Sequence, residues 1–372
     1  MSYRINPPFR ADHVGSLLRP KELLQARERF SRDEIDAAGL RRAEDEAIQD
    51  VVRFQEEIGL DTVTDGEFRR TFFHTDFLEK LKGIEIKGGI AKKFHRVDGD
   101  VDFAPPKLVV TGKLERDREI TVEDFKFLKS VASKTPKLAI PSPTMVHFRG
   151  GRGAIDDVSY PDMEEFFHDL AAVYREEIAD LAANGCTYLQ LDDTNLAYLC
   201  DPNLQQATRE LGEDPDRLPH IYAGLINDCL RGVPDTMTTA IHLCRGNFRS
   251  AWVAEGGYDP VAEVLFNEIN VDTYFLEYDD ERSGGFAPLR HVPDNKTVVL
   301  GLVSSKLPQL ESRDEIRQRI EEAARYMPLE RLCLSPQCGF SSTVHGNDLT
   351  VDDERAKLEM VIEIADEVWG GS

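Results

Sequence analysis

Short apolar runs alternate with longer amphipathic stretches along almost the whole chain, and this alternation limits the possible folds more than any other feature. The runs that predict β-strands are 12–15, 61–65, 137–141, 187–192, 238–244, 272–277, 297–302 and 331–334. Apolar residues recur at helical spacing in the stretches 33–58, 162–184, 218–231 and 313–326. Strands that alternate with helices are typical of a parallel sheet built from βαβ units.

The segment 83–112 breaks the alternation. It is rich in glycine and lysine and contains a β-like run at 107–111, so we expect a β-hairpin-like insertion there. No glycine fingerprint for a dinucleotide follows an early strand, which favours a (β/α)₈ TIM barrel of the α/β class over an open sheet. Because no repeat or Pro/Ser linker divides the chain, we expect residues 1–372 to form a single catalytic barrel domain.

The charge and cysteine content narrow the class of protein. Asp and Glu number 68 against 45 Lys and Arg, a net charge of −23, which argues against nucleic acid and anionic membranes as partners. No apolar run is long enough to span a bilayer, and the first residues lack the apolar core of a signal peptide. Six cysteines without a CxxC pair then predict a reduced, cytoplasmic protein whose cysteines are metal ligands or core residues.

Polar clusters follow strand after strand. In a barrel the carboxyl ends of all strands meet at one mouth, where the active site is built. Residues far apart in the sequence are therefore expected to lie together there. The clusters are AspHisValGlySer at 12–16, ThrAspGlyGlu at 64–67, AspAspThrAsn at 192–195, HisLeuCys at 242–244, Glu277, ValSerSer at 303–305 and SerProGlnCysGly at 335–339.

Four of these residues form a candidate zinc site. His242 and Cys244 are two apart on one strand and so point to the same face. Glu277 ends the next strand and Cys338 follows the last one, and two thiolates, an imidazole and a carboxylate suit tetrahedral Zn²⁺. Such an electron-rich zinc is suited to holding an incoming thiol as a thiolate. The remaining cysteines are interpreted as small apolar core residues: Cys186, Cys200, Cys229 and Cys333.

Together these motifs resemble the cobalamin-independent methionine synthases, in particular their catalytic barrel and short stand-alone relatives. The resemblance is carried by AspGlyGluPheArgArg (65–70), GlnLeuAspAsp (190–193), HisLeuCys (242–244), LeuGluTyrAspAsp (276–280) and SerProGlnCysGly (335–339). It implies that His242, Cys244, Glu277 and Cys338 are zinc ligands. It also implies that Glu67 and Asp192 hold the ammonium of homocysteine, and that Gly15 and Ser16 belong to a loop that cradles its carboxylate.

On the donor side the sequence departs from the family pattern. The family's proton-donating histidine is missing near Ser304, Phe148 stands near the place of a tryptophan that packs on the folate, and Tyr198 stands where an acid contacts the pterin. The amino-terminal half of the long synthases is absent. The methyl donor is therefore left open between methyl-folate and another donor. Arg149 and Arg152, on a glycine-rich loop, are candidates for clamping an anionic donor or are surface residues.

The sequence favours a zinc-dependent S-methyltransferase that makes methionine from homocysteine, with no protein nucleophile. One alternative is alkyl transfer to another small thiol such as coenzyme M, as in epoxyalkane chemistry. An alternative of a different class is a non-catalytic protein with a structural zinc, since four protein ligands close such sites. The expected partners are a small-molecule thiol and an alkyl donor, and a protein that delivers the donor is left open.

Overall fold

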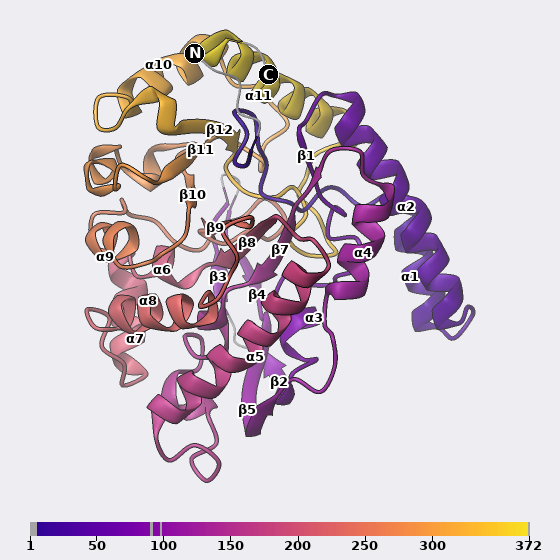
Figure 1. Cartoon of the computed structure of the whole chain (residues 1–372), viewed down its shortest axis with the longest axis vertical. Coiled ribbons are helices and arrows are strands. Elements are labelled where there is room, and N and C mark those ends of the chain that lie inside the picture. Colours follow the sequence, from indigo (N-terminus) through magenta and orange to yellow (C-terminus); the bar gives the residue numbers. More distant parts are fainter. Residues whose placement is uncertain (1–5, 90–91, 97–98, 371–372) are drawn as a thin grey trace.

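Six parallel strands form the main sheet, seen in a computed structural model that describes residues 6–89, 92–96 and 99–370 (Figure 1). The strands are β7 (Leu138–Pro141), β8 (Tyr188–Asp193), β9 (Thr238–Leu243), β10 (Thr273–Glu277), β11 (Thr297–Val303) and β12 (Leu332–Pro336). Each pairs in parallel with the next strand of this series, in the order β12-β11-β10-β9-β8-β7. The six corresponding predicted strands, and the parallel sheet, are therefore confirmed.

The first two predicted strands have different outcomes. Strand β1 (Thr62–Val63) lies within the predicted run 61–65 and pairs in parallel with β6 (Thr135–Pro136), which directly precedes β7. The predicted strand at 12–15 is wrong. The only ladder contact of that segment in the described chain is a single parallel bridge between the preceding residue, Ala11, and Leu334 of β12.

In the segment 12–15, side chains donate to the backbone carbonyls that would otherwise accept hydrogen bonds from a neighbouring strand. A ladder needs each carbonyl to accept from a neighbouring strand's N–H, but three consecutive carbonyls here accept from buried side chains instead. Asp and Gly are also depleted in strands. The three bonds run from Lys137 Nζ to His13 O (2.6 Å), from Gln190 Nε2 to Val14 O (2.8 Å) and from Thr64 Oγ1 to Gly15 O (2.6 Å).

Helices surround the strands on the outside (Figure 1). The predicted helix at 33–58 begins later, at residue 37, because Asp33 has a positive φ of 57° and Asp36 caps the helix by accepting from Gly39 N. The other three predicted helices are α5, α8 and α10. The α-helices are α1 (Lys21–Ser31), α2 (Ala37–Glu57), α3 (Thr75–Leu78), α4 (Val122–Val131), α5 (Met163–Ala183), α6 (Asn195–Tyr198), α7 (Pro202–Glu210), α8 (Leu218–Cys229), α9 (Ala262–Asn267), α10 (Arg313–Ala323) and α11 (Val351–Trp369).

The insertion predicted at 83–112 is confirmed as β structure, apart from residues 90, 91, 97 and 98, which lie outside the described residues. Strand β2 (Lys82–Gly89) pairs antiparallel with β5 (Pro106–Glu115), and β3 (Lys92–Phe94) pairs antiparallel with β4 (Val101–Phe103). The β3–β4 pair reaches the loop after β9, since His95 N donates to Trp252 O at 2.7 Å and Trp252 N donates to His95 O at 2.9 Å. The insertion is thereby held against the carboxyl end of the sheet.

Four cysteines lie in apolar core clusters, as the sequence predicts. All six cysteines are buried free thiols, and Cys186, Cys200 and Cys229 lie in the large apolar cluster beneath the helices. Cys333 belongs to a small cluster on successive strands, where it packs with side chains such as Tyr188 and Phe275. Within the described residues, none of the helices combines the length and apolar character needed to cross a bilayer.

Candidate metal centre and active site

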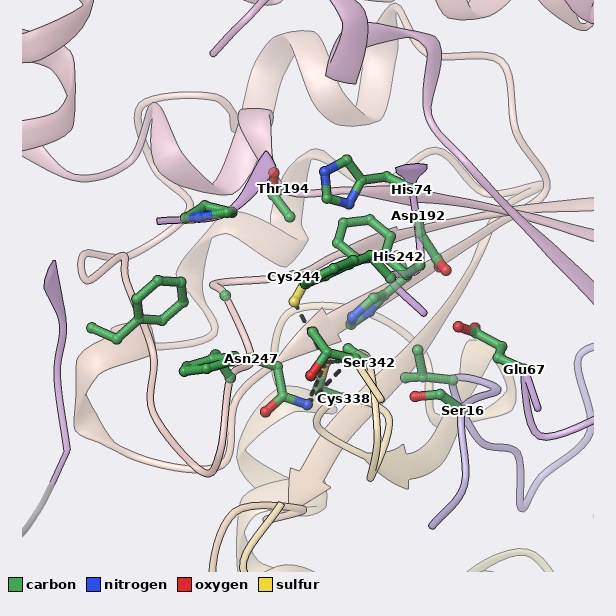
Figure 2. Close-up of a pocket in the computed structure, with 18 of the residues that line it drawn as sticks. Ser16, Glu67, His74, Asp192, Thr194, His242, Cys244, Asn247, Cys338 and Ser342 are labelled. Atoms are coloured by element: carbon green, nitrogen blue, oxygen red, sulfur yellow. Dashed lines mark hydrogen bonds between the residues drawn. The ribbon is translucent and has the colours of Figure 1, made fainter. Parts of the chain in front are cut away.

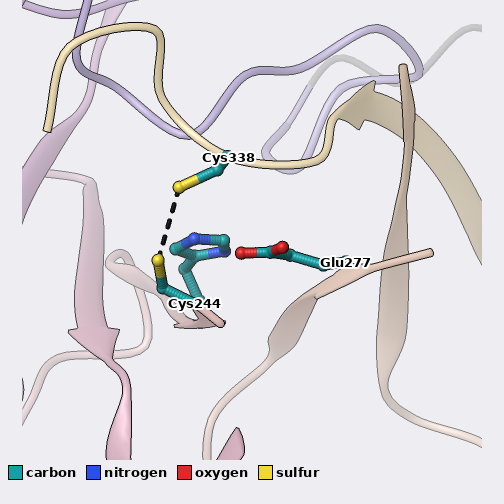
Figure 3. A group of neighbouring side chains, drawn as sticks. Cys244, Glu277 and Cys338 are labelled. Atoms are coloured by element: carbon teal, nitrogen blue, oxygen red, sulfur yellow. Dashed lines mark hydrogen bonds between the residues drawn. The ribbon is translucent and has the colours of Figure 1, made fainter. Parts of the chain in front are cut away.

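The four predicted zinc ligands come together at the carboxyl end of the sheet. His242 lies in β9 and Cys244 directly follows it, Glu277 ends β10, and Cys338 lies two residues beyond β12. All four are buried, and their ligand atoms lie within 4.8 Å of one another. The sulfur atoms of Cys244 and Cys338 are 3.4 Å apart, and Figure 3 shows these thiols and the Glu277 carboxylate converging from separate segments. The topology thus joins residues 96 positions apart, from 242 to 338, into one cluster.

The cluster has the properties of a metal-binding group. Both ring nitrogens of buried His242 lack a hydrogen-bond partner, which is unusual for buried polar atoms unless a ligand satisfies them. The hydrogen bond from Cys244 holds the pKa of the Cys338 thiol well below its usual range, and the same contact raises that of Cys244. The pair therefore favours one thiolate already. Two sulfurs, one imidazole and one carboxylate at these separations fit tetrahedral Zn²⁺.

Neighbouring groups fix the orientation of the Glu277 carboxylate. The backbone N–H of Arg245 donates to Glu277 Oε1 at 2.9 Å, and Gln337 Nε2 lies 3.4 Å from Oε2. The Glu277 backbone N–H donates to the buried hydroxyl of Tyr258 at 3.0 Å. Such contacts hold a ligand in place before a metal arrives and are a common feature of metal sites.

A pocket opens over the cluster and contains the predicted substrate residues. Ser16, Glu67 and Asp192 line it together with three of the four ligands, His242, Cys244 and Cys338 (Figure 2). Gly15 lies behind Glu67, since a β-carbon on Gly15 would sit 3.5 Å from Glu67 Oε1. Its φ of 144° also disfavours any other residue there.

Glu67 is a buried carboxylate with one oxygen atom that lacks a hydrogen-bond partner. It is a non-glycine residue with a positive φ of 59°, and such strained backbone is frequent at functional sites. Its Oε2 atom is buried without a hydrogen-bond partner, 3.6 Å from Arg70 Nη1. Burial raises the pKa of Glu67 to about 7, although Arg70 opposes the rise, and the carboxylate of Asp192 adds to it.

The second carboxylate, Asp192, ends the buried strand β8. Its Oδ1 accepts from Gln190 Nε2 at 2.7 Å, and burial raises its pKa. The charge of Asp192 raises the pKa of Glu67, and a cation between two buried carboxylates favours their ionised forms.

The loop that carries the motif at 335–339 packs against the loop at 14–16. A β-carbon on Gly339 would come within 1.9 Å of Ser16 Oγ, so any larger residue there would displace the Ser16 hydroxyl. The backbone N–H of Phe340 donates to Ser16 O at 2.9 Å. This contact joins the loop that carries Cys338 to the segment predicted to cradle a carboxylate.

The predicted donor-side residues divide into three groups. Arg149 and Tyr198 line the pocket over the metal cluster. Phe148 lines a second cavity, which Arg149 also borders, and its ring meets that of Tyr198 edge-on at 6.2 Å. Ser304 is absent from the lining of both cavities as the described residues define them, and its backbone N–H donates to Glu311 Oε1 at 2.7 Å.

Several pocket residues are missing from the sequence prediction, and most are aromatic. Phe103 of the insertion stacks on Phe248 of the β9 loop, with ring centroids 3.9 Å apart. Nothing in the sequence links the insertion to the strand ends. His74 lies only seven positions beyond Glu67, so its proximity to a motif was the one available signal. The additional lining residues are Phe72, Phe73, His74, Phe94, Phe103, Pro105, Gly246, Asn247, Phe248, Ser342 and Thr343.

The fold and site define a class: an α/β protein with a parallel sheet and a His–Cys–Glu–Cys metal-type cluster at its carboxyl end. The family model "Cobalamin-independent synthase, Catalytic domain" matches residues 9–367. The chain therefore belongs to the cobalamin-independent methionine synthase family, whose members are methyltransferases. The resemblance stated from the sequence motifs is thus confirmed.

Individual relatives agree with the family. The chain is 48% identical to the uncharacterized protein YxjH of Bacillus subtilis over 367 residues, covering 97% of this chain and 95% of YxjH. It is 26% identical to the methionine synthase of Pyrococcus furiosus over 328 residues, covering 88% and 85% of the two chains. It is also similar to the solved structure of the putative vitamin-B12 independent methionine synthase from Listeria monocytogenes, with a TM-score of 0.79, 36% identity and coverage of 99% and 100%.

Proposed function

We propose that the protein is a zinc-dependent S-methyltransferase that converts homocysteine to methionine. The observation that carries the proposal is that one pocket contains both a sulfur-rich metal-type cluster and a pair of buried carboxylates. A cluster of this kind suits a thiol, and the carboxylates suit an ammonium. Homocysteine has both groups on one small skeleton. The methyl donor stays open between methyl-folate and another alkyl donor.

The chain's own residues would hold the amino acid. The unpartnered Oε2 of Glu67 and the carboxylate of Asp192 accept from the ammonium. The loop of Gly15 and Ser16 receives the carboxylate, with the Ser16 hydroxyl as a donor. The aromatic side chains of the pocket, Phe103 and Phe248 among them, exclude water from the sulfur.

Zinc held by His242, Cys244, Glu277 and Cys338 would lower the pKa of the substrate thiol, so that the thiolate is present at neutral pH. Transfer then forms a bond between the homocysteine sulfur and the alkyl carbon of the donor. The bond from that carbon to its leaving group breaks, and the leaving group keeps the electron pair. Because the substrate is itself the nucleophile, no side chain of the protein needs to form a covalent intermediate.

We also propose that the chain closes as a single (β/α)₈ barrel domain. Two contacts beyond the six-stranded sheet support closure near the first predicted strand. The hydroxyl of Thr64 donates to Gly15 O, and Leu17 N donates to Gly66 O at 3.1 Å. A closed barrel would account for strand ends from the whole chain meeting at one pocket.

Zinc K-edge X-ray absorption on the purified protein, with and without homocysteine, tests the proposal. We expect a first shell with two sulfurs that becomes three when homocysteine is added. Cys338→Ser should lose zinc, whereas Cys229→Ser, a change of another buried cysteine on α8, should keep both the metal and the response. An unchanged sulfur count would indicate a structural metal or a different thiol. A protein that binds no zinc would refute the proposal.

A further inference from the structure

Arg149 is a partly buried cation at the junction of two cavities. It lines both the pocket over the metal cluster and the neighbouring cavity. Its Nε atom is buried without a hydrogen-bond partner, and Nη1 contacts His74 Nε2 at 3.1 Å. In the described part of the chain this guanidinium forms no ion pair with a carboxylate. A guanidinium that is partly withdrawn from water, with a buried and unused Nε–H and no anionic partner, is expected to gain such a partner when a ligand is bound.

The side chain of His74 contacts this guanidinium. Because Arg149 can only donate, His74 Nε2 is the acceptor, and the proton of the neutral ring must lie on Nδ1. Burial, followed by the charge of Arg149, holds the pKa of His74 well below its usual range, which keeps the ring neutral. The buried Nδ1–H has no partner either. The Nε2 edge of His74 holds the guanidinium in place, and the Nδ1–H points to the other side of the ring. Arg149 therefore contributes a positive charge and an unused Nε–H, the two features that bind an anionic group.

The carboxylate of homocysteine does not suit this position. In an amino acid the carboxylate and the ammonium are attached to the same carbon, so they must bind near each other. Glu67 and Ser16 lie together on one side of His242, whereas His74 lies beside Thr194 on another (Figure 2). The anion that contacts Arg149 therefore belongs to the other molecule in the reaction.

The second cavity has the space for that molecule. The pocket over the metal cluster has a volume of about 50 Å³ and the second cavity about 500 Å³. Apolar side chains line part of the larger cavity, including Phe148, Leu204 and Leu211. The carboxylate of Asp201, which also borders it, is already used, since Oδ1 accepts from Asn203 N at 2.8 Å and Oδ2 from Glu255 N at 3.0 Å.

We propose that Arg149, held in place by His74, forms an anion-binding subsite for the alkyl donor. The donor then carries a carboxylate or a phosphate, with its body in the second cavity and its alkyl carbon directed toward the metal cluster. The assignment of this anion to the donor rests on the proposed function, because that function places the amino-acid thiol on the Glu67 side. The anion site itself depends only on the geometry around Arg149.

Arginine Nε–H resonances of the zinc-loaded protein test the subsite directly. The Arg149 signal is identified as the one lost in Arg149→Gln. Titration with inorganic phosphate, and separately with acetate, is carried out at constant ionic strength. We expect a saturable shift of this signal with at least one probe: a response to phosphate indicates a phosphorylated donor, and a response to acetate a carboxylate donor. No saturable shift with either probe overturns the proposal.

Variants separate the subsite from other roles of the same residues. His74→Phe keeps the ring and should weaken binding of the responding anion about 3- to 10-fold. Arg209→Gln, which removes an exposed arginine on α7, should leave the titration unchanged. If Arg149→Gln does not fold, Arg149→Lys can identify the signal instead, because lysine retains the charge but has no Nε–H. A normal anion response in His74→Phe would show that His74 does not hold Arg149 in place and so overturn the two-residue assignment.

The metal provides the last control. Arg149→Gln should keep its zinc and still gain a third sulfur on addition of homocysteine. Loss of zinc in this variant would mean that Arg149 balances the charge of the metal cluster, and the subsite would be wrong. If homocysteine adds no sulfur in the wild type while the Arg149 signal still shifts, the proposed function fails and the anion site stands.

Discussion

Binding of an amino acid should release a proton from Glu67. This carboxyl group has a pKa of about 7 in the empty pocket, against its usual 4.5, chiefly because it is buried. An ammonium placed between Glu67 and Asp192 stabilises the ionised form and returns the pKa toward 4.5. Methionine, the expected product, is the best ligand for the test because it has no thiol that would release a proton of its own.

The size and sign of the effect follow from the two pKa values. At pH 6 a group of pKa 7 is about 0.9 protonated, and one of pKa 4.5 is almost fully ionised, so binding should release about 0.9 proton. The release should fall to about 0.5 at pH 7 and about 0.1 at pH 8. Because binding favours the ionised form, affinity rises with pH between 4.5 and 7. The shift of 2.5 units limits the total gain to about 3 kcal/mol.

Calorimetric titration in buffers of different ionisation enthalpy measures this proton release. Glu67→Gln should release far fewer protons than the wild type on binding methionine at pH 6, and its affinity should change less than that of the wild type between pH 5 and 8. Glu46→Gln, at an exposed position on α2, should behave as the wild type does. If Glu67→Gln released as many protons at pH 6 as the wild type, the release would come from another group and the assignment of Glu67 would be refuted.

Three further variants test other parts of the structure. Removing a residue that only supports a metal ligand typically lowers metal affinity by about 10- to 100-fold. Cys338→Ser removes a proposed ligand itself, so zinc affinity should fall further than that. Metal analysis after dialysis measures the loss. Glu354→Gln keeps an acceptor for Leu18 N but no longer titrates. Burial raises the pKa of Glu354 to about 8 in the folded protein. Because the unfolded protein ionises this group near pH 4.5, the free energy of unfolding of the wild type falls as the pH rises from 4.5 to 8. The variant lacks this loss, so in urea unfolding at pH 8.5 it should be up to about 5 kcal/mol more stable than the wild type. Phe103→Ala should remove about 1 kcal/mol of stacking on Phe248 and speed amide exchange in β3 and β4; unchanged exchange would contradict this packing.

The sequence predicts those parts of the fold that depend on local pattern. The six strands of the sheet are short, mostly apolar runs, and such runs are recognisable because both faces of a parallel strand are buried. The segment 12–15 fails as a strand for a reason that is not local. Its carbonyls accept from the side chains of Lys137, Gln190 and Thr64, residues that lie 49 to 176 positions away. No pattern within a short segment contains that information.

The residues of the site likewise divide into those that the local sequence pattern predicts and those that it does not. The metal cluster could be predicted because each of its residues lies at or just after a strand end, and parallel strands bring those ends together. The positions of Glu67 and Asp192 in the pocket follow from the same rule. The aromatic side chains of the insertion could not be placed, because the packing of Phe103 on Phe248 depends on how a hairpin folds back over the sheet. Ser304 follows a strand and yet lines neither of the two cavities as the described residues define them: its backbone N–H donates to Glu311 Oε1, and its hydroxyl accepts from Lys306 N.

These differences suggest why one half of the reaction is easier to assign than the other. In the proposed thiol half of the pocket, the metal cluster and Asp192 lie at or just after strand ends, so the sheet fixes their positions. The proposed donor half consists of the turn at Arg149, the loop of His74 and the insertion, which lie outside the sheet. A chain can therefore keep its metal cluster and exchange its donor by altering these loops alone. On this reasoning the unpaired guanidinium of Arg149, more than the cluster, is the feature that identifies the donor.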